Sequence, residues 1–309
     1  MIEFKKVNAI QIDGADPGMG LHSTAFGVYL NLLKQFCSRE LFLLESMGPS
    51  SIDTRVSLIG INPVLNIEVF DCIISISGNQ QLLKKIQLIY SRELLVDANM
   101  HILKYQLTSR NAVWDFLRLL DTQFQMVEDG VLAFSAFSYN TIHFIEDISG
   151  YIQGDVPDIY FTCYSTYIEF EDDRVMLHEY GFTGAKCIGL PEIVSCLSLN
   201  AVTPSVLANL PFSVNRETLK DSYLKKAEVA LQHVQVGDVY QIQIGQKISI
   251  KSDISALEVY ARLRTLNPSP YMYLFDYGDL KVIGASPELF IYMKDQQVMM
   301  RPIAGTLGK

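Results

Sequence analysis

The chain is poor in charged residues and lacks the motifs that mark several common enzyme classes. Only 19% of its 309 residues are charged, and acidic residues outnumber basic ones, so the net charge is −9. Such a balance argues against nucleic acid or an anionic membrane as the main partner. There is no GxGxxG, GxxxxGK[ST], GxSxG or HExxH pattern, and therefore no sign of the nucleotide, hydrolase or zinc-protease sites that these patterns indicate.

Long apolar runs and clustered cysteines are also missing. No apolar run approaches the ~20 residues needed to span a bilayer, and no signal peptide is visible at the N-terminus. The five cysteines are widely spaced without a CxxC pattern, which is typical of reduced thiols. The five histidines show no HxxxH spacing, so no zinc site is predicted. We therefore expect a cytoplasmic globular protein.

The apolar pattern predicts an α+β fold with large antiparallel sheets and interleaved helices, because β-rich runs dominate and helices lie between groups of strands. Ser23 or Thr24 can cap a first helix. A proline-containing stretch at residues 201–212 is the best linker candidate, and it divides the chain into predicted domains 1–210 and 211–309.

Residues after this linker show the clearest periodicity. Asn215 is predicted to cap a helix running from Arg216 to about Val236, with Gly237 as its C-terminal cap. Residues 239–250 alternate with period two and predict a strand, and residues 256–266 predict another helix. Gln246 falls on the apolar face of that strand. Because an unpaired buried amide costs about 1–3 kcal/mol, we expect it to have a backbone or ligand partner.

Residues 267–309 contain four short apolar runs separated by brief breaks, which predicts an antiparallel meander. Its loops at residues 267–270, 284–288 and 304–308 are built of small and polar residues. Small residues let the backbone approach a ligand closely. These loops are therefore either tight turns or, together with Gln246, a binding site.

Five segments, in this order, resemble the large subunit of anthranilate synthase, a chorismate-utilising enzyme. They are LLES at 43–46 with R-x-S-x-x-G at 55–60, GD-x-Y-Q ending in Gln246 at 237–246, NPSPYM at 267–272, GASPE at 284–288 and RPIAGT at 301–306. The resemblance implies a chorismate-binding enzyme fold. Residues 1–210 would then be a regulatory or scaffold domain, and 211–309 would begin the catalytic domain. Gly245 departs from the serine or alanine that the family has before the glutamine.

The resemblance also implies a reaction and its regulation. The family converts chorismate and ammonia to anthranilate and pyruvate in tryptophan biosynthesis, uses Mg²⁺, and takes ammonia from a glutamine amidotransferase partner. Many members are inhibited by L-tryptophan, whose indole suits an apolar slot and whose ammonium group suits a carboxylate and carbonyls. The implied inhibitor site consists of Glu45, Ser46, Asn267, Pro268, Pro270, Tyr271 and Met272. The alternative is that NPSPYM is only a rigid turn entering a strand.

The implied substrate side lies in the later loops. Gln246, Ser286 and Glu288 would bind substrate, and Ala304, Gly305 and Thr306 would form the catalytic loop. Relatives that make aminodeoxychorismate often carry a nucleophilic lysine where this chain has Ala304. Alanine offers no nucleophile, which favours addition of ammonia or water. Isochorismate and salicylate synthases stay open as alternatives, although NPSPYM argues against them.

In the family, the Mg²⁺-binding glutamates and the general acid and base lie mostly beyond the RPIAGT motif. We therefore expect the Mg²⁺ ligands beyond residue 309, a chain that is truncated after this motif, and no catalysis by this chain alone. A second hypothesis is a tryptophan-binding and partner-docking module without catalysis.

Overall fold

A computed structural model describes residues 2–12, 24–37, 41–48, 56–90, 94–126, 132–171, 174–182, 190–198, 211–216, 218–276, 280–294 and 296–303. The chain forms two compact units, one of residues 1–203 and 263–309 and one of residues 204–262. These units differ from the predicted segments 1–210 and 211–309. The prediction that residues 211–309 begin a catalytic domain concerns function and stays a prediction. Among the described residues, no helix combines the length and apolar character needed to cross a membrane.

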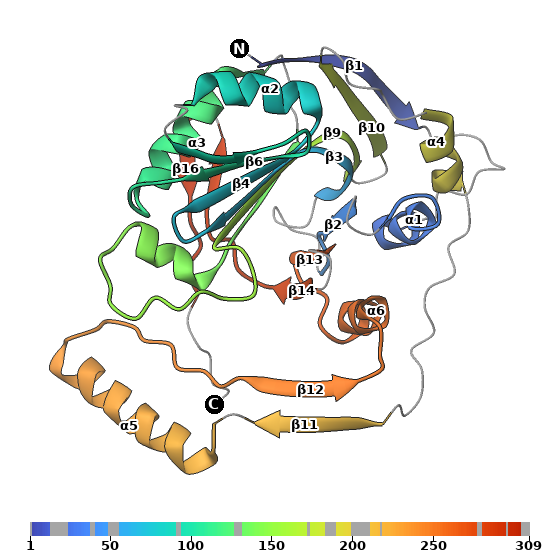
Figure 1. The fold of residues 1–309 in the computed structure, drawn as a ribbon. Helices are drawn as coiled ribbons and strands as arrows, with labels where there is room; N and C mark the ends of the chain where they lie inside the picture. The colour runs from blue at the N-terminus through green and yellow to red at the C-terminus, as the bar shows by residue number, and fades with distance from the viewer. Residues whose placement is uncertain are drawn as a thin grey trace. The chain divides into compact units, whose positions relative to one another are not determined.

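The larger unit is built on a 12-stranded sheet, many strands of which are labelled in Figure 1. Its main path runs, in spatial order, through β14 (Lys281–Ser286), β13 (Tyr271–Asp276), β2 (Leu41–Glu45), β3 (Val56–Phe70), β9 (Ile159–Glu171), β10 (Arg174–Phe182), β1 (Ile2–Ile12) and β7 (Phe124–Met126). Four further strands pair off this path: β4 (Ile73–Gly78), β5 (Leu95–Ala98), β6 (Ile102–Gln106) and β8 (Leu132–Phe137). Of the described pairings in this sheet only β1 with β7 is parallel. The predicted α+β fold with a large antiparallel sheet is confirmed.

Helices cover this sheet in two groups (Figure 1). Helices α2 (Gln80–Ile89) and α3 (Ala112–Gln123) pack on the core around β3, β4 and β6, where Ile67, Leu82 and Phe116 are buried. Helices α1 (Ala25–Leu32) and α4 (Leu190–Ser198) pack against each other. A short 3₁₀ helix, η3 (Tyr139–Phe144), follows β8. Each large apolar side chain buried in this way contributes about 1.5–3 kcal/mol.

The sheet brings distant parts of the chain side by side. Strand β13 inserts between β14 and β2, and its register places Met272 opposite Glu45 and Leu274 opposite Leu43. A late segment of the chain therefore completes the edge of a sheet formed mostly by early strands. This pairing decides where the predicted inhibitor residues meet.

The smaller unit contains a two-stranded antiparallel sheet of β11 (Phe212–Arg216) and β12 (Ile248–Ser252), helix α5 (Lys220–Val236), and the start of α6 (Ala256–Leu266). Asn215 was predicted to cap the first helix of this region, which is wrong. Asn215 pairs with Ser249 in the sheet, and α5 begins at Lys220 without a side-chain cap. The predicted C-terminal cap is confirmed, because Gly237 has the left-handed φ of +82° that glycine tolerates best.

The predicted strand at residues 239–250 is largely wrong. Only its end, from Ile248, forms a strand, because the register of β11 reaches no further than Arg216 opposite Ile248. Period-two alternation defines two faces but does not supply the neighbouring strand that a ladder needs. Tyr240 and Gln246 are exposed rather than buried, so the expectation of a buried amide fails.

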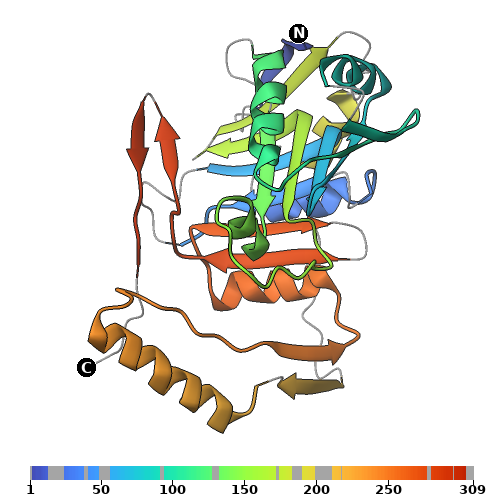
Figure 2. The same ribbon diagram turned by 60° about the vertical axis from the view of Figure 1, so that its left-hand side comes forward.

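The predicted meander of residues 267–309 is also split. β13 and β14 form an antiparallel hairpin in the large sheet, whereas β15 (Tyr292–Lys294) and β16 (Gln297–Met299) form a two-stranded sheet of their own, seen as the red hairpin in Figure 2. Pro287 follows the last residue of β14. Proline has no N–H to donate to a ladder, which explains why the pairing ends there.

Candidate functional site

The predicted inhibitor residues come together where β2 meets β13. Glu45 is the last residue of β2 and lies opposite Met272, and their side chains are only 4% and 1% exposed. The backbone N–H of Met47 donates to the carbonyl oxygen of Ser269 at 3.0 Å, which ties the chain after β2 to the loop before β13. The LLES and NPSPYM segments are therefore adjacent in the sheet, and a backbone hydrogen bond also joins the residue after LLES to NPSPYM.

Within the described part of the chain, three N–H groups donate to the buried carboxylate of Glu45. Arg264 Nε lies 2.7 Å from Oε2 and Arg264 Nη2 lies 3.0 Å from Oε1, while the backbone N–H of Phe26 lies 3.2 Å from Oε1. Phe26 is the second residue of α1, and a helix N-terminus favours a negative charge. The Arg264 guanidinium carbon also sits 4.9 Å from the centroid of the Phe26 ring. We call the set Phe26, Glu45 and Arg264 the Glu45 cluster.

The remaining predicted inhibitor residues surround this cluster. Ser46 donates its hydroxyl to the carbonyl of Val56 at 2.7 Å, so this hydroxyl is committed to β3. Asn267 directly follows α6, and its backbone N–H donates to the carbonyl oxygen of Leu263 at 2.8 Å. Its own carbonyl accepts the Ser269 hydroxyl at 3.1 Å. Pro268 is exposed, and Pro270 and Tyr271 are partly buried.

Sequence reasoning missed Phe26 and Arg264. Arg264 lies three residues before NPSPYM, in the last turn of α6. A charged residue on the buried side of a helix needs an opposite charge, which is the only signal that sequence offers here. That signal does not name Glu45, since the two residues are 219 positions apart.

One predicted substrate loop, residues 284–288, contacts the residue that precedes the predicted catalytic loop. The Ser286 hydroxyl accepts the backbone N–H of Glu288 at 3.2 Å, and the Glu288 carboxylate accepts the backbone N–H of Ile303 at 3.1 Å. Glu288 thus fixes the backbone just before the predicted catalytic loop. Ala304, Gly305 and Thr306 themselves lie outside the described residues. Gln246 belongs to the smaller unit, and nothing in the structure places it beside Ser286 or Glu288.

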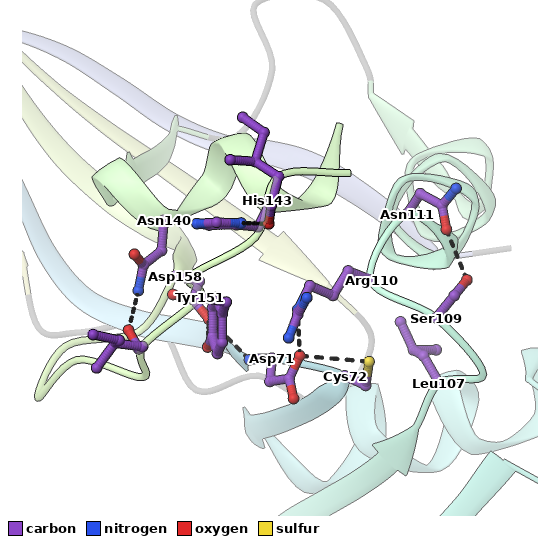
Figure 3. Close-up of polar contacts among 12 residues, drawn as sticks. Asp71, Cys72, Leu107, Ser109, Arg110, Asn111, Asn140, His143, Tyr151 and Asp158 are labelled. Carbon is purple, nitrogen blue, oxygen red and sulfur yellow. Dashed lines mark hydrogen bonds and ion pairs between the residues drawn. The ribbon is translucent and has the colours of Figure 1, made fainter. Parts of the chain in front are cut away.

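A second polar cluster that the sequence did not indicate surrounds Asp71, in the turn between β3 and β4 (Figure 3). Arg110 Nε lies 2.6 Å from Asp71 Oδ1, and the guanidinium carbon of Arg110 lies 4.1 Å from the ring centroid of Tyr151. The Cys72 thiol donates to the same Asp71 oxygen at 3.6 Å. Burial, the Asp71 charge and this hydrogen bond raise the pKa of Cys72, while the Arg110 charge lowers it.

Asp158 anchors both Asp71 and Tyr151 in this cluster. Its Oδ2 accepts the backbone N–H of Asp71 at 2.8 Å and the hydroxyl of Tyr151 at 2.7 Å. Asp71 has a φ of +53°, a left-handed conformation that asparagine and aspartate tolerate better than most residues. The Asp158 contact therefore holds a tight two-residue turn in a specific geometry.

The described residues do not fit a metal ion. Within that part of the chain, no three histidine, cysteine, aspartate or glutamate side chains converge closely enough to hold one. Mg²⁺ prefers several oxygen ligands in near-octahedral geometry.

Comparisons with known proteins point in one direction. A family model described as chorismate binding enzyme matches residues 78–309. The chain is 31% identical over 301 residues to a 2-amino-4-deoxychorismate synthase of Streptomyces globisporus, with 92% of this chain and 59% of that protein covered. It is 26% identical over 298 residues to anthranilate synthase component 1 of Lactococcus lactis subsp. lactis (strain IL1403), with the same shares covered.

The fold has a counterpart among solved structures. The crystal structure of anthranilate synthase component I from Streptococcus pneumoniae TIGR4 matches with a TM-score of 0.50 at 22% identity, over 80% of this chain and 53% of that chain. At this identity the match shows a shared fold only. The chain spans 59% of the length of the two relatives named above.

Proposed function

Because this chain belongs to the chorismate binding enzyme family, we propose that the full-length protein adds ammonia to chorismate and releases anthranilate, pyruvate and water. The observation that carries this proposal is Ala304 in the segment RPIAGT. A side chain without a nucleophile leaves room for ammonia itself to attack the ring and excludes a covalent enzyme intermediate at that position.

A second candidate product is supported by one comparison. The relative from Streptomyces globisporus, 31% identical over 301 residues, is named a 2-amino-4-deoxychorismate synthase. An enzyme that stops after amination keeps the enolpyruvyl side chain on the ring, whereas an anthranilate synthase expels it as pyruvate. The two activities share the ammonia-addition step, so release of pyruvate separates them.

We propose that the described residues on the substrate side both order the local backbone and contact the substrate. The Glu288 carboxylate accepts the backbone N–H of Ile303, the last described residue before Ala304 in the sequence. We propose that Ser286, Glu288, Gln246 and the loop of Ala304, Gly305 and Thr306 contact chorismate. Mg²⁺, when bound, would neutralise negative charge on the substrate. We propose that its ligands lie outside this chain's described residues.

Two partners complete the proposal. We propose that ammonia comes from a glutamine amidotransferase subunit, as the designation component 1 of the Lactococcus lactis relative suggests for that protein. We also propose that L-tryptophan inhibits the enzyme by binding between residues 45–46 and 267–272. The direct pairing of Glu45 with Met272 supports this, because the two segments line one junction.

Product analysis tests the proposal. The full-length protein is incubated with chorismate, an ammonium salt and Mg²⁺, and anthranilate fluorescence and pyruvate are both measured. Equal amounts of anthranilate and pyruvate are expected. Amination without pyruvate supports the second candidate, and formation of isochorismate or salicylate rejects both.

A further inference from the structure

We propose that Arg264 binds the carboxylate of the amino-acid ligand and that Glu45 is the positioning residue that holds its guanidinium group. This inference rests on the proposed function, since it assumes that an aromatic amino acid binds beside β2 and β13. It changes the chemistry expected from the sequence, in which the carboxylate of Glu45 would receive the ligand's ammonium group.

The first argument is that the charge of Glu45 is already compensated. Two N–H groups of Arg264 and the backbone N–H of Phe26 donate to its carboxylate, and its side chain is 4% exposed. A ligand ammonium group that displaced Arg264 would leave a guanidinium without a counter-charge in a largely buried place. Removing one partner of a buried ion pair is strongly unfavourable, so the pair is expected to persist when a ligand binds.

The second argument is that Arg264 has donors to spare. A guanidinium carries five N–H groups in a rigid planar fork. Within the described residues, Glu45 is the only hydrogen-bond acceptor of Arg264, and it uses Nε and Nη2. Nη1 is left for a ligand, and the Arg264 side chain remains 16% exposed. Planar forks of this kind match carboxylate geometry.

The third argument is that the guanidinium is held in place before any ligand arrives. Glu45 fixes one edge of it, and the Phe26 ring lies 4.9 Å from its central carbon. Less rotamer freedom is then lost on binding. The position also suits a cation, because Arg264 lies in the last turn of α6.

The ammonium group of the same ligand then has an alternative place in the loop 267–270. Among the described residues, the carbonyl of Asn267 accepts one hydrogen bond, from the Ser269 hydroxyl, and the carbonyl of Ser269 accepts one, from the N–H of Met47. Each carbonyl oxygen has a second lone pair. Arg264 is a cation that suits a carboxylate, and these carbonyl oxygens suit an ammonium group, so both charges of a zwitterion have a candidate partner in the segments 264–270.

Calorimetry with three ligands separates the two chemistries in the full-length protein. L-Tryptophan carries both charges, tryptamine lacks the carboxylate, and indole-3-propionate lacks the ammonium group. Arg264→Met is expected to lower the affinity for L-tryptophan and for indole-3-propionate by about 10- to 100-fold. It should change the affinity for tryptamine by less than about 2-fold. Arg264→Lys should recover part of the loss, because it keeps the charge but not the fork.

Two controls keep the test decisive. Arg262→Met removes an exposed arginine from the same helix and should leave all three affinities unchanged. If Arg264→Met folds poorly, the double variant Glu45→Gln with Arg264→Met removes both charges, and it should still bind indole-3-propionate about 10- to 100-fold more weakly than the wild-type protein does.

The opposite result is equally clear. If Arg264→Met leaves L-tryptophan binding unchanged or tighter while Glu45→Gln abolishes tryptamine binding, then Glu45 receives the ammonium group and the inference is overturned. If the wild-type protein binds no L-tryptophan, the inhibitor site and this inference fall together. The proposed amination of chorismate is judged separately, by its own products.

Discussion

Two arginine–carboxylate pairs in the larger unit share one construction and differ in burial. In both, a guanidinium contacts a carboxylate and an aromatic ring: Arg264 with Glu45 and Phe26, and Arg110 with Asp71 and Tyr151. The side chains of Arg110 and Asp71 are 33% and 41% exposed, whereas those of Arg264 and Glu45 are 16% and 4% exposed.

The difference follows from the place of each carboxylate in the sheet. Asp71 sits in the turn that links β3 to β4, at the periphery of the sheet, while Glu45 ends a strand flanked by β3 and β13. Water screens the outer pair and makes its contribution to stability small. The inner pair is screened much less, so its two charges depend on each other.

The largest expected effect is on the inner pair. Arg264→Met should lower the free energy of unfolding by about 3–5 kcal/mol, because it strands the buried carboxylate of Glu45. The double variant with Glu45→Gln should recover much of that loss, since neither charge then lacks a partner. Urea denaturation of the full-length protein measures both. A double variant no more stable than Arg264→Met would show that the pair does not act as a unit.

A smaller effect is expected on the outer pair. Arg110→Met should cost about 0.5–1 kcal/mol, and the cost should shrink in 1 M NaCl because exposed charges are screened. The cost at Arg264 should hardly depend on salt. Arg118→Met is the matched control, since Arg118 pairs with Asp115 at 3.0 Å on the exposed surface of α3. A salt-independent loss at Arg110 would contradict the contrast between the two pairs.

The smallest effect concerns the Cys72 thiol beside the outer pair. Burial and the Asp71 carboxylate raise the pKa of Cys72, and Arg110 lowers it. Asp71→Asn should therefore lower the pKa, increase the thiolate fraction at pH 8 and speed alkylation by iodoacetamide. Arg110→Met should slow it. Site-specific mass spectrometry follows Cys72 apart from the exposed Cys37. Equal rates in both variants would show that the two charges do not act on this thiol.

Elements that depend on neighbouring residues could be predicted well. The helix predicted at 256–266 is α6 (Ala256–Leu266), and Thr24 caps α1 by accepting the N–H of Gly27 at 3.2 Å. Caps and helical periodicity involve residues a few positions apart. The strand predicted at 239–250 failed mostly because alternation without a partner strand does not make a sheet.

The candidate site was predictable only as a set of segments. The resemblance named Glu45 and Met272, and the structure sets them opposite each other. It did not supply Arg264 or Phe26, whose roles exist only once both residues have met Glu45 in the folded chain. Ala304, Gly305 and Thr306 remain predictions.

By itself, the sequence determined the class of fold, several of the helices and caps, and the family, because periodicity, capping and short motifs are written in consecutive residues. Only the tertiary structure decided which charge neutralises Glu45 and which donors of Arg264 that contact uses. The physical reason is burial. Packing removes water from around an ion pair, so each buried charge then depends on its partner for compensation. In this chain the two partners are 219 positions apart, and only the folded structure brings them together.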